Sequence, residues 1–139
     1  PFGETEELHR HNSKTFWRDV RNVTPFCGDD RVVWKLSVAP TAAPGILSAL
    51  SHLKEVEAYL DAAGGVIWLA TQSPKQGAYE AIAQAGGGHA TLIRGPASLR
   101  NAIPVFQPQP GPLAALSQRL KDSFDPNRVL NPGRMTEGL

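Results

Sequence analysis

The spacing of hydrophobic residues along the chain predicts four β-strands. Over residues 32–38 apolar side chains fall at every second position, so one face of this strand is apolar and Lys35 lies on the other. Helix propensity alone would allow 53–63 to continue a helix, but apolar and polar residues alternate there and Gly64-Gly65 follows, which favours a hairpin. The other three predicted strands are residues 56–60, 66–70 and 89–94.

Apolar side chains spaced three or four residues apart predict four helices. The first is expected to be capped by Ser13 and to end near Pro25. The last is expected to begin at Pro112 and to end at Asp125-Pro126. The two helices between them are predicted at residues 41–52 and 76–85, the latter with Tyr79 facing inward and with three glycines after it.

The order of these elements predicts an α+β fold. Strand, helix, strand, strand, helix, strand is the ferredoxin-like βαββαβ arrangement, an antiparallel sheet with two helices on one face, here followed by a C-terminal helix and tail. Residues 95–112 contain five of the twelve prolines, so we expect no regular structure there. The expected organisation is a leader and short helix (1–30), the ferredoxin-like core (31–96), a proline-rich crossing loop (97–112) and the C-terminal helix and tail (113–139).

Composition narrows the function classes without adding a site. A length of 139 residues suits one domain. The chain has 14 basic and 13 acidic residues, and because the basic ones are scattered they indicate neither a nucleic-acid surface nor a polybasic membrane anchor. No apolar run approaches the roughly 20 residues of a membrane-spanning helix. One cysteine, Cys27, allows no internal disulfide, which fits the cytoplasm. Because the chain begins at Pro1 without a methionine, we expect it to be the interior of a longer polypeptide.

Three strings resemble a known enzyme family. The string from Leu120 to Met135, with its FDP and NPGR motifs, resembles the C-terminal signature of the FAD-linked oxidases of the vanillyl-alcohol-oxidase type. The strings VWKLSV (33–38) and GGHATLIR (87–94) are similar to the FAD-binding subunit of glycolate oxidase in particular. The resemblance covers about residues 31–135 and identifies the chain as the C-terminal cap domain of such a subunit.

This resemblance implies a role in oxidising a 2-hydroxy acid, with glycolate converted to glyoxylate. A hydride passes to FAD, which the family binds mainly through an N-terminal domain that is not in this sequence, so the chain alone is expected to be inactive. The glycines at 86–88 follow a predicted helix. A loop that binds a pyrophosphate instead needs glycines immediately before a helix. The implied partners are other oxidase subunits, including an iron-sulfur protein, which would place the chain in the cytoplasm or peripheral to the inner membrane.

Three tail residues are candidates for cofactor binding. In the family this tail returns to the flavin domain, and Asn131 and Arg134 offer hydrogen-bond donors while Gly133 permits a tight bend. The alternative is that Asn-Pro-Gly only stops the helix. Asp125 is interpreted as structural, because it precedes a proline at the predicted helix end.

Three core residues are candidates for substrate binding and catalysis. Lys35 occupies a strand position that is basic in the family, usually arginine, and it or Arg94 would bind the substrate carboxylate. His89 would take the hydroxyl proton as a base. The alternatives are a solvated lysine, an arginine in a surface ion pair and a hydrogen-bonded structural histidine.

Other functions remain open at this point. The ferredoxin-like architecture also serves small-ligand-binding and regulatory modules, so such a module is the main alternative. An RNA-binding βαββαβ domain would need the aromatic-glycine consensus, which is missing. Trp17, Trp34 and Trp68 are expected in the core, and no metal site is expected, since His9 and His11 have no further ligand nearby.

Overall fold

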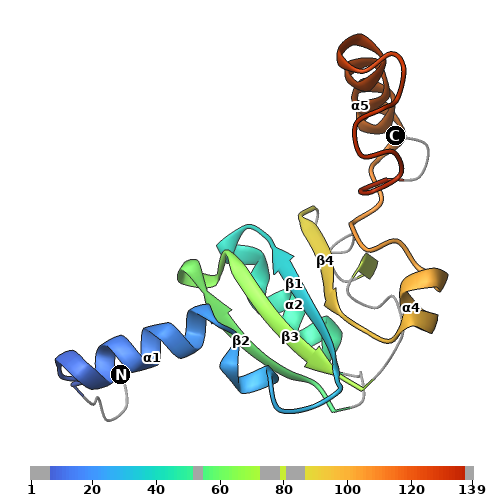
Figure 1. The fold of residues 1–139 in the computed structure, drawn as a ribbon. Helices are drawn as coiled ribbons and strands as arrows, with labels where there is room; N and C mark the ends of the chain where they lie inside the picture. The colour runs from blue at the N-terminus through green and yellow to red at the C-terminus, as the bar shows by residue number, and fades with distance from the viewer. Residues whose placement is uncertain (1–6, 52–54, 73–78, 81–86, 137–139) are drawn as a thin grey trace.

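The computed structural model describes residues 7–51, 55–72, 79–80 and 87–136 and contains a four-stranded antiparallel sheet (Figure 1). Its strands are β1 (Val32–Ser37), β2 (Glu57–Asp61), β3 (Val66–Thr71) and β4 (His89–Arg94). Their order across the sheet is β2-β3-β1-β4, so the two central strands are the first and third in the chain. This is the strand order of a ferredoxin-like sheet, and it confirms the predicted α+β fold class.

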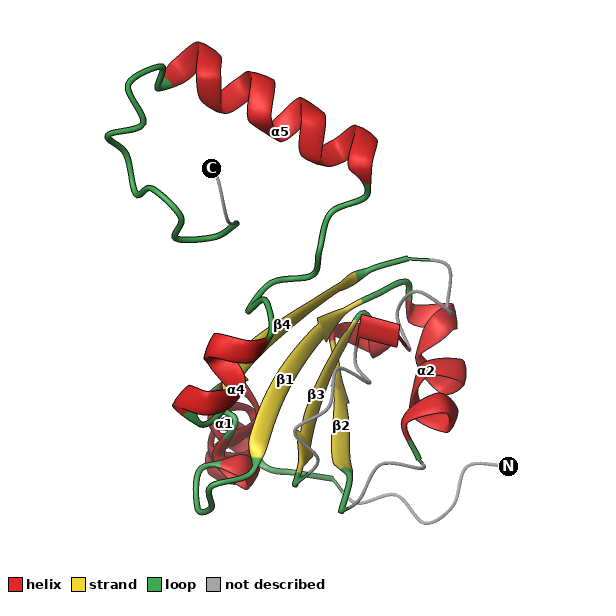
Figure 2. Cartoon of the chain, turned by 90° about the vertical axis from the view of Figure 1, so that its right-hand side faces the viewer, coloured by secondary structure: helices red, strands yellow, loops and turns green. Residues whose placement is uncertain are grey.

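Helices flank the sheet and follow it along the chain. They are α1 (Arg10–Arg21), α2 (Ala43–Leu50), α4 (Ala97–Ala102) and α5 (Gly111–Phe124), with short 3₁₀ turns at Thr24–Phe26, Pro40–Ala42 and Ala62–Gly64. Helix α2 connects β1 to β2 and lies against one face of the sheet, which we call the inner face (Figure 2). The helix predicted at 76–85 lies mostly outside the described residues, although residues 79–80 are helical.

The main core lies between the inner face and α2. Trp34 is at its centre, with only 1% of its surface exposed, and the Tyr79 ring meets it edge to face at 5.1 Å between centroids. The Tyr79 hydroxyl donates a hydrogen bond to the Pro104 carbonyl, and burial raises the pKa of Tyr79 to about 12. The other buried core side chains come from β1, α2, β3, β4 and α4 and from the residue that follows α4: Val32, Leu36, Ala43, Ile46, Leu50, Ile67, Leu69, Ala90, Leu92, Leu99 and Ile103.

The predicted hairpin is present, with a tight turn between β2 and β3. Ala62 and Ala63 have φ angles of 49° and 54°, and Gly64 follows at 90°. A side chain on Gly64 would lie at an ordinary van der Waals distance, 3.5 Å, from the Pro40 carbonyl oxygen, so it is the positive φ angle that favours glycine here. Turn chemistry, rather than helix propensity, therefore decides the conformation of this segment.

The prediction for the N-terminal helix was partly wrong. Helix α1 begins at Arg10, three positions before Ser13, and its N-cap residue His9 makes no side-chain capping bond. Residues 10–12 therefore belong to the helix and not to a loose leader. Trp17 was expected in the core but is 59% exposed, because α1 extends away from the sheet and its N-terminal turns pack on nothing within the described chain (Figure 1).

The expectation of a wholly irregular segment after β4 was also wrong. Helix α4 forms directly after Pro96, in six residues that contain no proline, and Leu99 anchors it in the core. Residues 105–107 then run antiparallel to β4 as a short edge segment, because Leu92 N–H donates to the Val105 carbonyl and Gln107 N–H to the Ala90 carbonyl. Prolines thus flank α4 and the 105–107 segment but lie within neither of them.

Helix α5 begins one residue before the predicted Pro112 and ends directly before Asp125 as predicted, but its apolar side chains remain uncovered. It extends apart from the sheet beyond the end of β4 (Figures 1 and 2). No helix in the described part of the chain is long and apolar enough to cross a membrane. The exposed apolar side chains of α5 are Leu113, Leu116, Leu120 and Phe124.

Candidate functional site

The sheet face opposite α2, which we call the outer face, carries polar and aromatic side chains in register. Strand pairing places Lys35 between Trp68 of β3 and Thr91 of β4. The neighbouring row places Ser37 beside His89. Because side chains two residues apart on a strand share a face, all five lie on one surface of the sheet.

Lys35 and His89 are close diagonal neighbours on this face. Lys35 pairs with Thr91, two residues from His89, and such diagonal positions are about 7–8 Å apart. Both side chains are exposed, and within the described residues neither is in an ion pair. The Lys35 ammonium lies over the Trp68 ring, 5.6 Å from its centroid. The strand positions of a cation and an imidazole are thus diagonal neighbours on the open face, with the ammonium itself on the Trp68 side of Lys35.

The opposite end of the outer face is covered. Phe26, in the 3₁₀ turn after α1, packs on Val33 and Ala70 to form a second small core with Tyr59 and Trp68 beside it. The Tyr59 hydroxyl donates to the Val20 carbonyl at 2.9 Å, which ties the end of α1 to the sheet.

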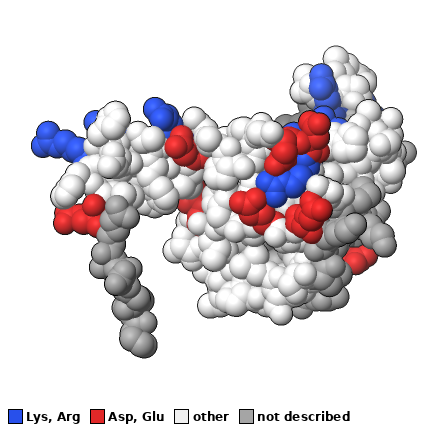
Figure 3. All heavy atoms as spheres, turned by 90° about the horizontal axis from the view of Figure 1, so that it is seen from below, with Lys and Arg blue, Asp and Glu red and all other residues white. Residues whose placement is uncertain are grey.

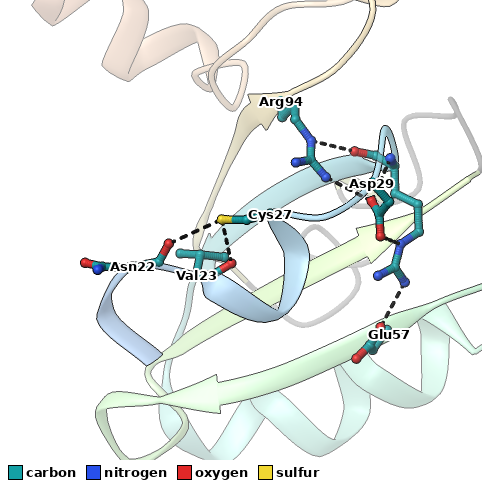
Figure 4. A network of polar contacts seen from close by, with 7 residues as sticks. Asn22, Val23, Cys27, Asp29, Glu57 and Arg94 are labelled. Atoms are coloured by element: carbon teal, nitrogen blue, oxygen red, sulfur yellow. Dashed lines mark hydrogen bonds and ion pairs between the residues drawn. The ribbon is translucent and has the colours of Figure 1, made fainter. Parts of the chain in front are cut away.

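A charged cluster fastens the loop before β1 over this covered end. The Arg31 guanidinium bonds the carboxylates of Asp29 at 2.7 Å and Glu57 at 2.9 Å, and Arg94 bonds Asp29 at 3.1 Å (Figure 4). The backbone N–H of Arg31, together with its guanidinium, holds the pKa of Asp29 below its usual value. On the surface the cluster appears as a basic patch ringed by acidic side chains (Figure 3).

A β-bulge decides the direction of Arg94. Trp34 pairs with Leu92, but its neighbour Val33 pairs with Arg94, so Ile93 is an extra residue on β4. Without this shift Arg94 would follow Leu92 onto the inner face. Its guanidinium also donates to the Arg31 carbonyl at 3.0 Å. The structure therefore places Arg94 in the ion-pair cluster, away from His89, and does not bring it to the open part of the face.

Asp125 organises the tail that contains the FDP and NPGR motifs. Its carboxylate accepts hydrogen bonds from the backbone N–H groups of Val129 and Leu130, both at 2.9 Å, and pairs with the Lys121 ammonium at 2.6 Å. The same ammonium donates to the Leu130 carbonyl. The Lys121 bond, followed by the two N–H donors, lowers the pKa of Asp125 to about 2. The structural interpretation of Asp125 is confirmed.

The predicted cofactor residues lie on the turn that Asp125 holds. Asn131 and Gly133 have φ angles of 45° and 67°, and the Arg134 N–H donates to the Asn131 carbonyl at 3.2 Å. Gly133 and Arg134 line a hollow of about 560 Å³ between the tail and the segment after α4. Gln107 faces the same hollow, and its amide oxygen is buried without a hydrogen-bond partner among the described residues.

The structure thus brings together some predicted site residues and not others. Lys35 and His89 share the open outer face, Arg94 lies in the ion-pair cluster, and Asn131, Gly133 and Arg134 form a separate group on the tail. The sequence interpretation missed Trp68, Ser37 and Thr91 as neighbours of Lys35 and His89. The two-residue period identifies the face of each strand, but only the pairing register shows that these side chains meet.

Comparison with known proteins gives a distant relative. The chain is 31% identical over 121 residues to the glycolate oxidase subunit GlcE of Escherichia coli (strain K12), a match that covers 86% of this chain. The same match covers 31% of that protein, so the chain spans about a third of the length of its relative. No family model matches the sequence, and no solved structure matches it.

Proposed function

We propose that this chain is the substrate (cap) domain of an FAD-dependent oxidoreductase that acts on 2-hydroxy acids, of which glycolate, oxidised to glyoxylate, is the smallest. The similarity to a glycolate oxidase subunit supports the reaction class. The observation that carries the proposal is the placement of Lys35 and His89 on one open sheet face. These are the groups that a 2-hydroxy acid requires, a cation for its carboxylate and a base for its hydroxyl proton.

The roles of the two residues follow from their chemistry. The Lys35 ammonium is a point charge with three donors, and it would bind the carboxylate of the substrate. His89 would accept the hydroxyl proton, while the hydrogen on the same carbon leaves as a hydride, so that the product is the 2-oxo acid. FAD, when bound, supplies the acceptor of that hydride. The sheet and its side chains would hold the substrate in place and exclude water from it.

The described residues can contact a flavin but offer no cradle for its pyrophosphate. Gly87 and Gly88 precede strand β4 and not a helix, and a side chain on Gly87 would meet nothing within 4 Å. Arg134, by contrast, lines a hollow on a turn held by Asp125 and has no ion-pair partner among the described residues. We therefore propose that FAD is bound mainly by polypeptide that corresponds to the unmatched part of GlcE, with Asn131, Gly133 and Arg134 adding contacts.

The uncovered face of α5 supports a role inside a larger assembly. A helix with an apolar stripe usually buries it against another element, yet Leu116, Leu120 and Phe124 are all exposed in this chain. We propose that the assembly includes other oxidase subunits, among them an iron-sulfur protein that accepts the electrons. In this proposal the chain is cytoplasmic, or peripheral to the inner membrane through those subunits.

The test uses the gene product that contains these residues, purified from its own host. We expect a flavin spectrum and glycolate-dependent reduction of an artificial electron acceptor. Lys35→Met should raise the KM for glycolate, and His89→Gln should lower kcat, while Lys14→Met, an exposed lysine of α1, serves as the matched control. A colourless protein that takes up no FAD would favour the alternative, a small-ligand-binding or regulatory module.

A further inference from the structure

A hollow of about 260 Å³ lies between the end of α1 and the outer sheet face, directly beside Lys35. Its apolar walls come from Trp17 and Val20 of α1 and from Val66 and Trp68 of β3. It is somewhat smaller than the roughly 300–1,000 Å³ of sites for drug-sized ligands, which suits one small molecule.

The charges around the hollow favour an anion. Lys35 and Arg21 both line it, and neither is in an ion pair within the described part of the chain. Asp61 is the opposing charge, with one carboxylate oxygen bound to the Ala62 N–H at 2.7 Å, so the lining holds two cations and one carboxylate and its net charge is positive. Two indole rings and two cations around one hollow are suited to a small aromatic carboxylate.

We propose that this hollow binds the side chain of the substrate, so that the protein prefers 2-hydroxy acids with an aryl or bulky apolar side chain over glycolate. This inference rests on the proposed function. Lys35 lies between Trp68 on one side and Thr91, next to His89, on the other. A carboxylate on Lys35 therefore leaves the hydroxyl toward His89 and the side chain toward the two tryptophans. Glycolate has no side chain and leaves the hollow empty.

The first experiment measures binding without the flavin. The indole N–H signals of the 139-residue chain are followed by NMR while 3-phenyllactate or glycolate is added at equal concentration. We expect 3-phenyllactate to shift the Trp17 and Trp68 signals and glycolate to shift neither. Trp34, which is 1% exposed and faces the other side of the sheet, is the internal control and should not move.

Variants test which groups make the site. Lys35→Met keeps the aliphatic stem over Trp68 but removes the charge, and it should weaken 3-phenyllactate binding by about fivefold or more. Lys14→Met should have no effect. Trp17→Ala, at an exposed position, should abolish the Trp68 shift while the Trp34 signal reports an intact core.

The outcomes separate this inference from the proposed function. Absence of Trp17 and Trp68 shifts, equal shifts with glycolate, or binding that survives both Lys35→Met and Trp17→Ala would overturn the side-chain site. In the intact flavoprotein we expect a higher kcat/KM for 3-phenyllactate than for glycolate, and the reverse order would also overturn it while leaving the oxidase role standing. A flavoprotein that oxidises neither acid, in spite of specific Trp17 and Trp68 shifts, would instead refute the oxidase role.

Discussion

Asp125 shows at the scale of a single residue how the tail is held in place. Its carboxylate satisfies two backbone N–H groups and one ammonium, so three positions of the chain depend on one side chain. The turn that carries Asn131 and Arg134 follows directly after these bonds. The conformation of the candidate cofactor residues therefore depends on the ionised state of Asp125.

The depressed pKa of Asp125 predicts how the tail responds to acid. The carboxyl normally titrates at 3.8 and titrates at about 2 in the folded chain, so its stabilising effect is complete above pH 3.8 and is lost as the pH falls toward about 2. We expect the carboxyl carbon signal of Asp125 to titrate at about pH 2, well below the ordinary aspartate value of 3.8. Faster amide exchange at Val129 and Leu130 in Asp125→Asn would reveal the loss of the Lys121 pair; unchanged exchange would contradict this role.

Arg134 gives a second prediction at this scale. In the complete flavoprotein, Arg134→Ala should lower flavin retention or turnover, because it removes the cation of the tail turn that lines the hollow. Arg119→Ala, on the exposed surface of α5, is the matched control. Flavin content is read from absorbance and folding from circular dichroism. If both variants keep the flavin content and turnover of the parent protein, Arg134 has no part in the site.

At the scale of elements, α2 covers the inner face of the sheet and builds the main core there. Its buried side chains, Ala43, Ile46 and Leu50, all point to the inner face, where Trp34 and Leu36 meet them. Since burial of apolar surface is the dominant favourable term in folding, this layer supplies much of the stability of the domain. The outer face can then carry Lys35 and His89 exposed without loss of the core.

The packing of α2 predicts a large effect of one truncation. Ile46 is fully buried, so Ile46→Ala should lower the free energy of unfolding by about 2–5 kcal/mol through lost burial and a residual cavity. Ser48→Ala, on the exposed side of the same helix, should change it by less than about 0.5 kcal/mol. Urea denaturation followed by tryptophan fluorescence measures both. Equal effects of the two substitutions would show that α2 does not pack as described.

At the scale of the whole molecule, the chain combines a ferredoxin-like core with two elements that extend away from it. Helices α1 and α5 both reach beyond the sheet, and both expose apolar side chains such as Trp17 and Phe124 (Figure 1). The α5 tail does not reach the outer sheet face, so the two groups of candidate residues lie apart in this chain. A complete site would need both groups on one ligand, which is why we propose that additional polypeptide holds the flavin.

This arrangement predicts that the 139-residue chain alone binds FAD weakly or not at all. Among the described residues no glycine-rich loop opens a helix, so this part of the chain offers no preformed cradle for the pyrophosphate. Titration of FAD with the purified chain should leave flavin fluorescence unquenched at micromolar concentrations. Tight, saturable quenching would place the cofactor site within this chain and contradict the proposed division of roles.

The sequence by itself determined the fold class and most of the local elements, although not the start of α1 or the helix α4. The two-residue period of β1, the glycines of the β2-β3 turn and the proline-bounded α5 all lie where the pattern predicts them, because each depends on residues that are neighbours in the chain. The FDP and NPGR motifs likewise indicated a helix end and a turn without any tertiary information.

Only the tertiary structure decided which candidate residues meet. Pairing of β1 with β4 makes Lys35 and His89 diagonal neighbours on one face. A one-residue bulge in β4 directs the Arg94 side chain toward the ion-pair cluster. The exposure of Trp17 also depends on where α1 leaves the sheet and not on its own spacing. The physical reason is the same in each case: strand register, bulges and helix docking are set by contacts between segments far apart in the chain, which no local pattern records.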